Sequence, residues 1–111
     1  MTKKTFTYEE ALEAFPAVRE ITGEAVARVT AALDTKSFES VEEIPDELIT
    51  EYNSIVAEWT DAMTTRGLEV KGLWLVDFDS GSGYYCWRYP ETALDHYHGY
   101  DEGFAGRVKL N

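Results

Sequence analysis

The segment from Cys86 to Arg107 concentrates side chains that could do chemistry. It holds the only cysteine, both histidines and two arginines. A thiol beside a histidine and a cation has a lowered pKa and can act as a nucleophile. Two arginines can instead hold a carboxylate or phosphate through paired hydrogen bonds. The segment therefore suggests either a reactive thiol or an anion-binding site.

A metal site is a third alternative. His96 and His98 are two residues apart, so on an extended segment both point to one side, near Asp95 and Asp101. These four side chains could hold a divalent cation. Two histidines with neither a third histidine nor paired cysteines are a weak metal signal, however, so the sequence assigns no metal site and predicts no cofactor.

A β-hairpin is predicted at about 73–89, because two runs rich in aromatic and branched residues flank the turn sequence at 80–83. Symmetric pairing about this turn places Asp77 opposite Cys86, with Arg88 diagonal to Asp77 on the same face. The other face should pack on helices. That face comprises Trp74, Val76, Phe78, Tyr85, Trp87 and Tyr89.

The polar face also has purely structural explanations. Cysteine in a strand is commonly a small buried apolar residue. Asp77 and Arg88 form a plain cross-strand ion pair in this register, and Arg107 could fasten the tail through Asp77 or Glu91.

Two helices are predicted before the hairpin, at about 8–33 and 45–66. Thr7 and Glu10 match a capping box at the first helix, and Pro45 and the acidic residues after it open the second. Pro16 removes a backbone donor, so we expect a short lead-in helix before a long one. Residues 34–44 should connect the two helices, and 90–111 should form a looped tail.

The predicted fold is a single α+β domain spanning residues 1–111. It is an antiparallel helical hairpin with a short N-terminal lead-in helix, packed on the C-terminal β-hairpin and looped tail. The apolar face of 45–66 is wider than one helix partner would cover. A homodimer that forms a four-helix bundle is therefore expected.

Composition excludes several classes of partner. With 21 acidic and 10 basic residues the formal charge is −11, which disfavours nucleic acid and anionic membranes. The sequence has no apolar run near the roughly 20 residues that span a bilayer and no basic leader, so a cytoplasmic acidic protein is expected. One cysteine excludes an internal disulfide.

Short motifs at both ends of the chain carry a family resemblance. Those near the C-terminus are Leu75-Val76-Asp77-Phe78, Cys86-Trp87-Arg88, Tyr97-His98 and Gly103-Phe104-Ala105-Gly106-Arg107. Those near the N-terminus are Phe6-Thr7-Tyr8-Glu9-Glu10-Ala11 and Phe15-Pro16-Ala17-Val18-Arg19. In these motifs the chain resembles an uncharacterised prokaryotic family, domain of unknown function 2203. Tyr97 replaces the family's usual tryptophan, Pro90 a glycine, and His96 an aromatic residue, so His96 inherits no role.

The resemblance implies no activity but selects six residues, which the hairpin geometry also brings together. They are Asp77, Cys86, Arg88, Glu91, His98 and Arg107. We expect a non-catalytic binding or interaction module in which these residues hold a small anion or an acidic group. The alternative is a small enzyme that uses Cys86 and His98 or a divalent metal.

Overall fold

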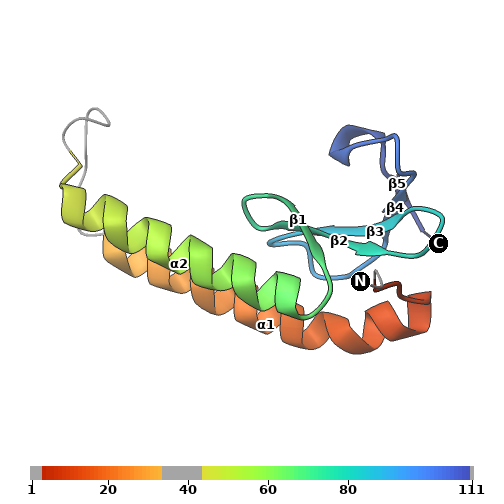
Figure 1. Cartoon of the computed structure of the whole chain (residues 1–111), viewed down its shortest axis with the longest axis horizontal. Helices are drawn as coiled ribbons and strands as arrows, with labels where there is room; N and C mark the ends of the chain where they lie inside the picture. The colour runs from red at the N-terminus through yellow and green to blue at the C-terminus, as the bar shows by residue number, and fades with distance from the viewer. Residues whose placement is uncertain (1–3, 34–43, 111) are drawn as a thin grey trace.

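The computed structural model describes residues 4–33 and 44–110. Two helices, α1 (Tyr8–Leu33) and α2 (Asp46–Thr65), run side by side in opposite directions, and an antiparallel sheet lies over one end of the pair (Figure 1). Almost all of the predicted connection at 34–44 lies outside the described residues. The predicted helical hairpin is confirmed.

The predicted lead-in helix is wrong, because α1 is a single helix with Pro16 inside it. Thr7 and Glu10 do form the capping box: the Thr7 backbone N–H donates to Glu10 Oε1 at 2.9 Å, and the Glu10 N–H donates to Thr7 Oγ1 at 3.1 Å. Phe15 and Val18, on either side of the proline, are both buried. Their burial favours a continuous helix and offsets the backbone hydrogen bond that Pro16 removes.

The sheet is a meander of five antiparallel strands in sequence order, larger than the predicted hairpin. The strands are β1 (Glu69–Gly72), β2 (Leu75–Asp79), β3 (Tyr84–Arg88), β4 (His96–His98) and β5 (Val108–Lys109). The predicted register of the central hairpin is confirmed, with Asp77 opposite Cys86. The prediction of a looped tail at 90–111 is wrong, because β4 and β5 extend the sheet beyond β3. A 3₁₀ turn, η2 (Phe104–Gly106), separates these two strands.

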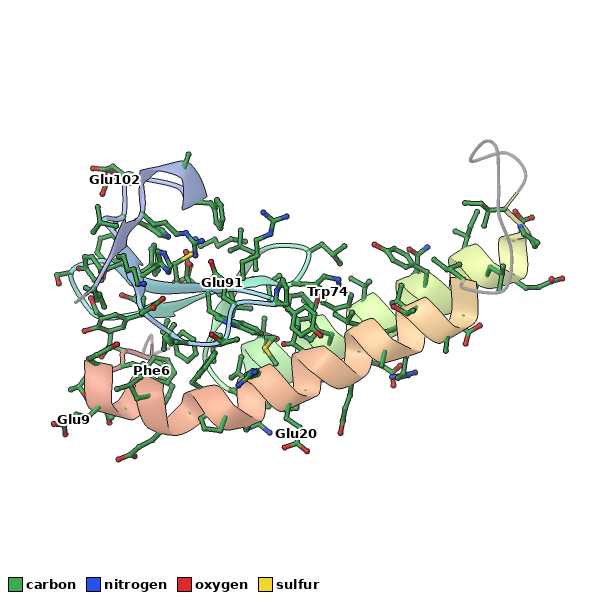
Figure 2. All side chains as sticks on the ribbon, turned by 180° about the vertical axis from the view of Figure 1, so that it is seen from behind. Phe6, Glu9, Glu20, Trp74, Glu91 and Glu102 are labelled. Atoms are coloured by element: carbon green, nitrogen blue, oxygen red, sulfur yellow. The ribbon has the colours of Figure 1, made fainter. Side chains whose placement is uncertain are left out.

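The aromatic face of the hairpin packs on the helices, as alternation predicted. Trp87 meets Phe15 of α1 edge to face at 5.3 Å, and Trp74 meets Trp59 of α2 at 4.9 Å. Trp74 lies in the turn before β2, with φ of 60°, rather than in a strand. Figure 2 shows Phe6 and Trp74 between the helices and the sheet. The core therefore holds one face of the sheet and leaves the other face to the tail.

The apolar face of α2 is buried toward the end of the helix and partly exposed near its start. Ile55, Trp59 and Met63 are buried, whereas Ile49 near the start of the helix is 37% exposed. The sheet covers only the other end of the helix pair (Figure 1). Among the described residues, neither helix combines the length and apolar character that a membrane crossing requires.

Gly83, immediately before β3, is needed because β4 approaches it closely. A Cβ at this position would lie 2.8 Å from the His98 carbonyl oxygen and would collide with the Tyr97 hydroxyl. We expect Gly83→Ala to lower the free energy of unfolding by about 1–3 kcal/mol, measured by urea denaturation. Gly103→Ala is the matched control, since nothing lies within 4 Å of its added methyl group. Equal stability of the two variants would contradict this packing of β4.

Candidate functional site

Three buried polar side chains meet on the face of the sheet that points away from the helices. Asp77 comes from β2, Cys86 from β3 and His98 from β4, so three neighbouring strands each supply one. Asp77 and Cys86 are 1% exposed and His98 is 4% exposed. Alternation along each strand turns these side chains to the same face. The tail then closes over a cluster of an acid, a thiol and an imidazole.

The hydrogen bonds of His98 fix where its protons are. Its Nδ1 lies 2.9 Å from the Gly99 carbonyl oxygen, which can only accept, so Nδ1 carries a proton and donates it. Its Nε2 lies 3.0 Å from Asp77 Oδ2, so one further proton is shared between these two atoms. The pair is therefore neutral as a whole, whichever partner holds that proton.

The second oxygen of Asp77 is the least satisfied group of the cluster. Asp77 Oδ1 is buried and has no hydrogen-bond partner among the described residues. A buried acceptor without a donor costs about 1–3 kcal/mol, so proteins seldom keep one unless something else binds there. One ligand atom each from Asp77, Cys86 and His98 lies within 4.8 Å of the other two.

Burial dominates the ionisation of the cluster. It raises the pKa of the Cys86 thiol to about 12, the adjacent Asp77 carboxylate adds to the rise, and Arg107 partly offsets it. Burial likewise raises the pKa of Asp77, against the opposing effects of Cys86 and His98. Cys86 is therefore a neutral thiol near pH 7, unlike the low-pKa cysteines that act as nucleophiles.

Slow alkylation of Cys86 follows from its burial and raised pKa. We expect iodoacetamide to modify the native protein at pH 8 at least about tenfold more slowly than the same chain unfolded in urea. Mass spectrometry of timed samples measures both rates, and the unfolded chain is the matched control because it holds the same single thiol. Equal rates would restore the reactive thiol as an explanation of the cluster.

A cavity of about 330 Å³ opens over the cluster. Tyr84 and Tyr100 form an aromatic wall, with ring centroids 5.0 Å apart, and the Tyr84 ring lies 5.4 Å from the His98 ring. Lys71 reaches the same cavity, where its Nζ lies 4.6 Å from the centre of the Tyr84 ring and 3.1 Å from Glu69 Oε1. The cavity is lined by Lys71, Leu75, Asp77, Tyr84, Cys86, His98, Tyr100, Glu102, Gly103 and Phe104.

The other three predicted site residues form a fastening beside the cavity. Glu91 accepts two hydrogen bonds from the Arg107 guanidinium, one of them at 2.9 Å, and one from the Arg88 backbone N–H at 2.9 Å. Burial alone would raise the pKa of Glu91, but these hydrogen bonds bring it below its ordinary value. Arg88 itself is exposed and lies over the Phe104 ring at 5.3 Å, as Arg107 does at 4.0 Å. The fastening of Arg107 to Glu91 is confirmed.

The structure thus places the six predicted residues in two adjoining groups of three, with Arg107 also close to Cys86. Arg88 makes no ion pair with Asp77, whose hydrogen-bond partner is His98. His96 turns to Asp95, with His96 Nδ1 2.9 Å from Asp95 Oδ1, while His98 turns to Asp77. The four-residue metal alternative at 95–101 is therefore not assembled. Within 4–33 and 44–110, Asp77, Cys86 and His98 form the one group with metal-ligand geometry.

Sequence reasoning missed most of the cavity wall. Tyr84 could have been found, because it alternates with Cys86 and Arg88 on the same face of β3. Lys71, Tyr100 and Phe104 gave no such signal, since only the pairing of β1 and β4 with the central hairpin brings the first two near Asp77.

Comparisons with known proteins give a family and no activity. The model of the family described as "Uncharacterized conserved protein (DUF2203)" matches residues 4–110. Searches of the curated proteins and of the solved structures found no match. The matched range includes both helices, all five strands and every residue that lines the cavity. The chain therefore belongs to the DUF2203 family.

Proposed function

We propose that the chain is a non-catalytic binding module whose site is the cavity over Asp77, Cys86 and His98. The observation that carries this proposal is the buried Asp77 Oδ1, which faces its neighbours without a partner at the floor of an open cavity. A cavity of about 330 Å³ is at the small end of the usual range for ligand sites, roughly 300–1,000 Å³. It therefore suits a small polar molecule.

The ligand is proposed to carry an acidic group. Lys71 at the cavity wall is the cation that would receive it, because Arg107 is already occupied by Glu91, Arg88 lies outside the lining, and both ring nitrogens of His98 have partners. A donor on the same ligand, such as a hydroxyl or a protonated acid, would satisfy Asp77 Oδ1. The aromatic wall of Tyr84 and Tyr100 would cover its apolar part.

Thermal unfolding with small acids tests this proposal. Inorganic phosphate, acetate and succinate are added at millimolar concentration, and at least one should raise the unfolding midpoint, since a ligand at 100 times its Kd stabilises by about 2.7 kcal/mol. Lys71→Ala should abolish the shift. Lys109→Ala is the matched control, because that lysine is exposed on β5. The proposal fails if none of the three probes shifts the wild-type midpoint, or if both variants respond alike.

An enzymatic role receives less support. A thiol whose pKa is raised to about 12 is almost wholly protonated near neutral pH, so it lacks the thiolate that nucleophilic catalysis requires. A single buried cysteine is also what a reducing compartment permits, which supports the proposed cytoplasmic location.

Self-association is proposed at the end of the helix pair that the sheet does not cover. Apolar side chains gather there around a hollow with hardly any polar surface, lined by Leu33, Ile44, Leu48, Ile49 and Tyr52. Two copies could bury these ends against each other as a four-helix bundle. Sedimentation of the wild type at micromolar concentration tests the homodimer, with Ile49→Glu expected to give a monomer. A monomeric wild-type mass would remove the proposal.

A further inference from the structure

We propose that Asp77, Cys86 and His98 bind one divalent transition-metal ion, with Zn²⁺ the best match. The inference deepens the proposed function, because it names what the floor of the same cavity holds. A carboxylate oxygen, a thiolate and an imidazole nitrogen are the three ligand types that Zn²⁺ takes in proteins. One such atom from each residue lies within 4.8 Å of the others.

The spacing is close to that of a zinc site. Bonds of about 2.0–2.3 Å in a tetrahedral arrangement separate neighbouring ligand atoms by roughly 3.5 Å. His98 Nε2 and Asp77 Oδ2 are 3.0 Å apart, and the widest separation in the cluster is within 4.8 Å. Side-chain rotations that shift these ligand atoms by about 1 Å would therefore place all three at bonding distance from one ion.

The surroundings of His98 are those of a metal ligand. Histidines that bind metals almost always donate their other ring N–H to a carbonyl or carboxylate, which fixes the ring. Here Nδ1 donates to the Gly99 carbonyl oxygen at 2.9 Å, so Nε2 is the nitrogen aimed at the cluster. The backbone that follows β4 therefore already holds the ring in a ligand orientation.

The unpartnered oxygen is an independent observation. Asp77 Oδ1 is buried without a donor among the described residues, although its carboxylate sits between the His98 ring and the Cys86 thiol. A metal ion supplies the missing positive partner. The Cys86 thiol also lies beside this carboxylate, but a thiol is only a weak donor.

Charge and proton balance also fit a divalent ion. Cys86 would release its thiol proton, and the proton shared by Asp77 and His98 would leave as both atoms turn to the metal. Two protons thus pass to solvent. The thiolate and the carboxylate then carry two negative charges, which balance the two positive charges of the ion. A buried site of zero net charge avoids the cost of an uncompensated charge.

Three protein ligands leave a fourth coordination position. Because all three residues line the cavity, this position is reached from the cavity rather than from the core. Sites with three protein ligands and one open position bind water or a further ligand there. The acidic group of the proposed small molecule would be such a ligand.

Co²⁺ titration tests the metal site. The chelator-stripped wild type should bind one equivalent of Co²⁺ with a thiolate charge-transfer absorption, release about two protons, and lose the absorption when Zn²⁺ is added. Cys86→Ser should remove the absorption, and His98→Gln should weaken binding by about 100-fold or more. His96→Ala is the matched control, since that histidine lies opposite Cys86 in the sheet but turns to Asp95 and is not among the three ligand residues.

The outcomes separate the metal from the proposed function. If the wild type shows no thiolate absorption or proton release, the metal site is wrong, even when small acids still raise the unfolding midpoint of the metal-free protein. If His96→Ala loses the absorption, the metal sits at a different ligand set and this assignment is overturned. If Co²⁺ binds as described but no acid binds with or without it, the metal stands and the small-molecule function fails.

Discussion

Asp77→Asn is expected to keep the fold and lose the ligand, whereas Asp77→Ala is expected to unfold readily. The amide can donate to His98 Nε2 in place of the shared proton, and it removes a carboxylate whose pKa burial has raised. Its free energy of unfolding should lie within about 1 kcal/mol of the wild type, or above it. Asp77→Ala leaves the buried His98 Nε2 without a partner and should lower the free energy of unfolding by about 3 kcal/mol. Urea denaturation measures the free energy of unfolding of both variants.

The two variants distinguish a binding residue from a structural one. A side chain kept for binding is commonly suboptimal for stability, so its conservative replacement costs function and not stability. The Co²⁺ and small-acid probes should both fail on folded Asp77→Asn. If asparagine destabilises as much as alanine, or if it still binds the probes, Asp77 is part of the framework and the site is assigned wrongly.

Acidification should narrow the difference between Asp77→Asn and the wild type. The folded pKa of Asp77 is raised above its ordinary value of 3.8, so below about pH 4 the acid is protonated in both states and imposes no penalty. As pH rises through the folded pKa, the wild type must either bury a charge or keep a proton that the unfolded chain releases. The free energy of unfolding of Asp77→Asn should therefore exceed that of the wild type by most near neutral pH, as urea denaturation across this pH range would measure.

Short-range pattern was enough to predict the centre of this site. Alternation around the turn at 80–83 placed Asp77 opposite Cys86 and Trp87 on the core side, and both placements are confirmed. That success is physical, because a slip of one residue would expose the aromatic face and bury the polar one. The hairpin register therefore has one solution with a large energetic advantage.

The strands on either side of the hairpin could not be predicted in this way. β4 is only His96–His98 and β1 is Glu69–Gly72, each too short and too polar to show a period. They are strands because β3 and β2 offer free edges to pair with. His98 was selected both as a possible partner of Cys86 in the tail and by family resemblance, but its contact with Asp77 depends on this pairing.

Arg88 and Pro16 were misjudged for a common reason. Local rules ended the helix near Pro16 and paired Asp77 with Arg88, whereas the folded chain buries Phe15 and Val18 on either side of the proline and turns Asp77 to His98. In both places tertiary packing outweighed a local preference. Arg107, for which the sequence left Asp77 and Glu91 as alternative partners, pairs with Glu91.

Trp87→Ala should have the largest effect on stability of any change discussed here, lowering the free energy of unfolding by about 3–5 kcal/mol. Trp87 is wholly buried, its ring packs edge to face on Phe15, and its indole N–H donates to the Glu91 carbonyl oxygen at 2.8 Å. It therefore joins α1, β3 and the start of the tail. Urea denaturation followed by circular dichroism measures the loss.

Two controls separate the contributions of this side chain. Trp87→Phe keeps an aromatic ring beside Phe15 but loses the hydrogen bond to Glu91, and should cost roughly 1–2 kcal/mol more than the loss of ring volume alone. Arg88→Ala changes the next residue on the exposed face and should cost about 0.5–1 kcal/mol, through its contact with Phe104. If Arg88→Ala destabilised the protein as much as Trp87→Ala, the polar face of β3 would contribute as much to stability as the core face. The assignment of one face to the core and the other to the binding site would then be wrong.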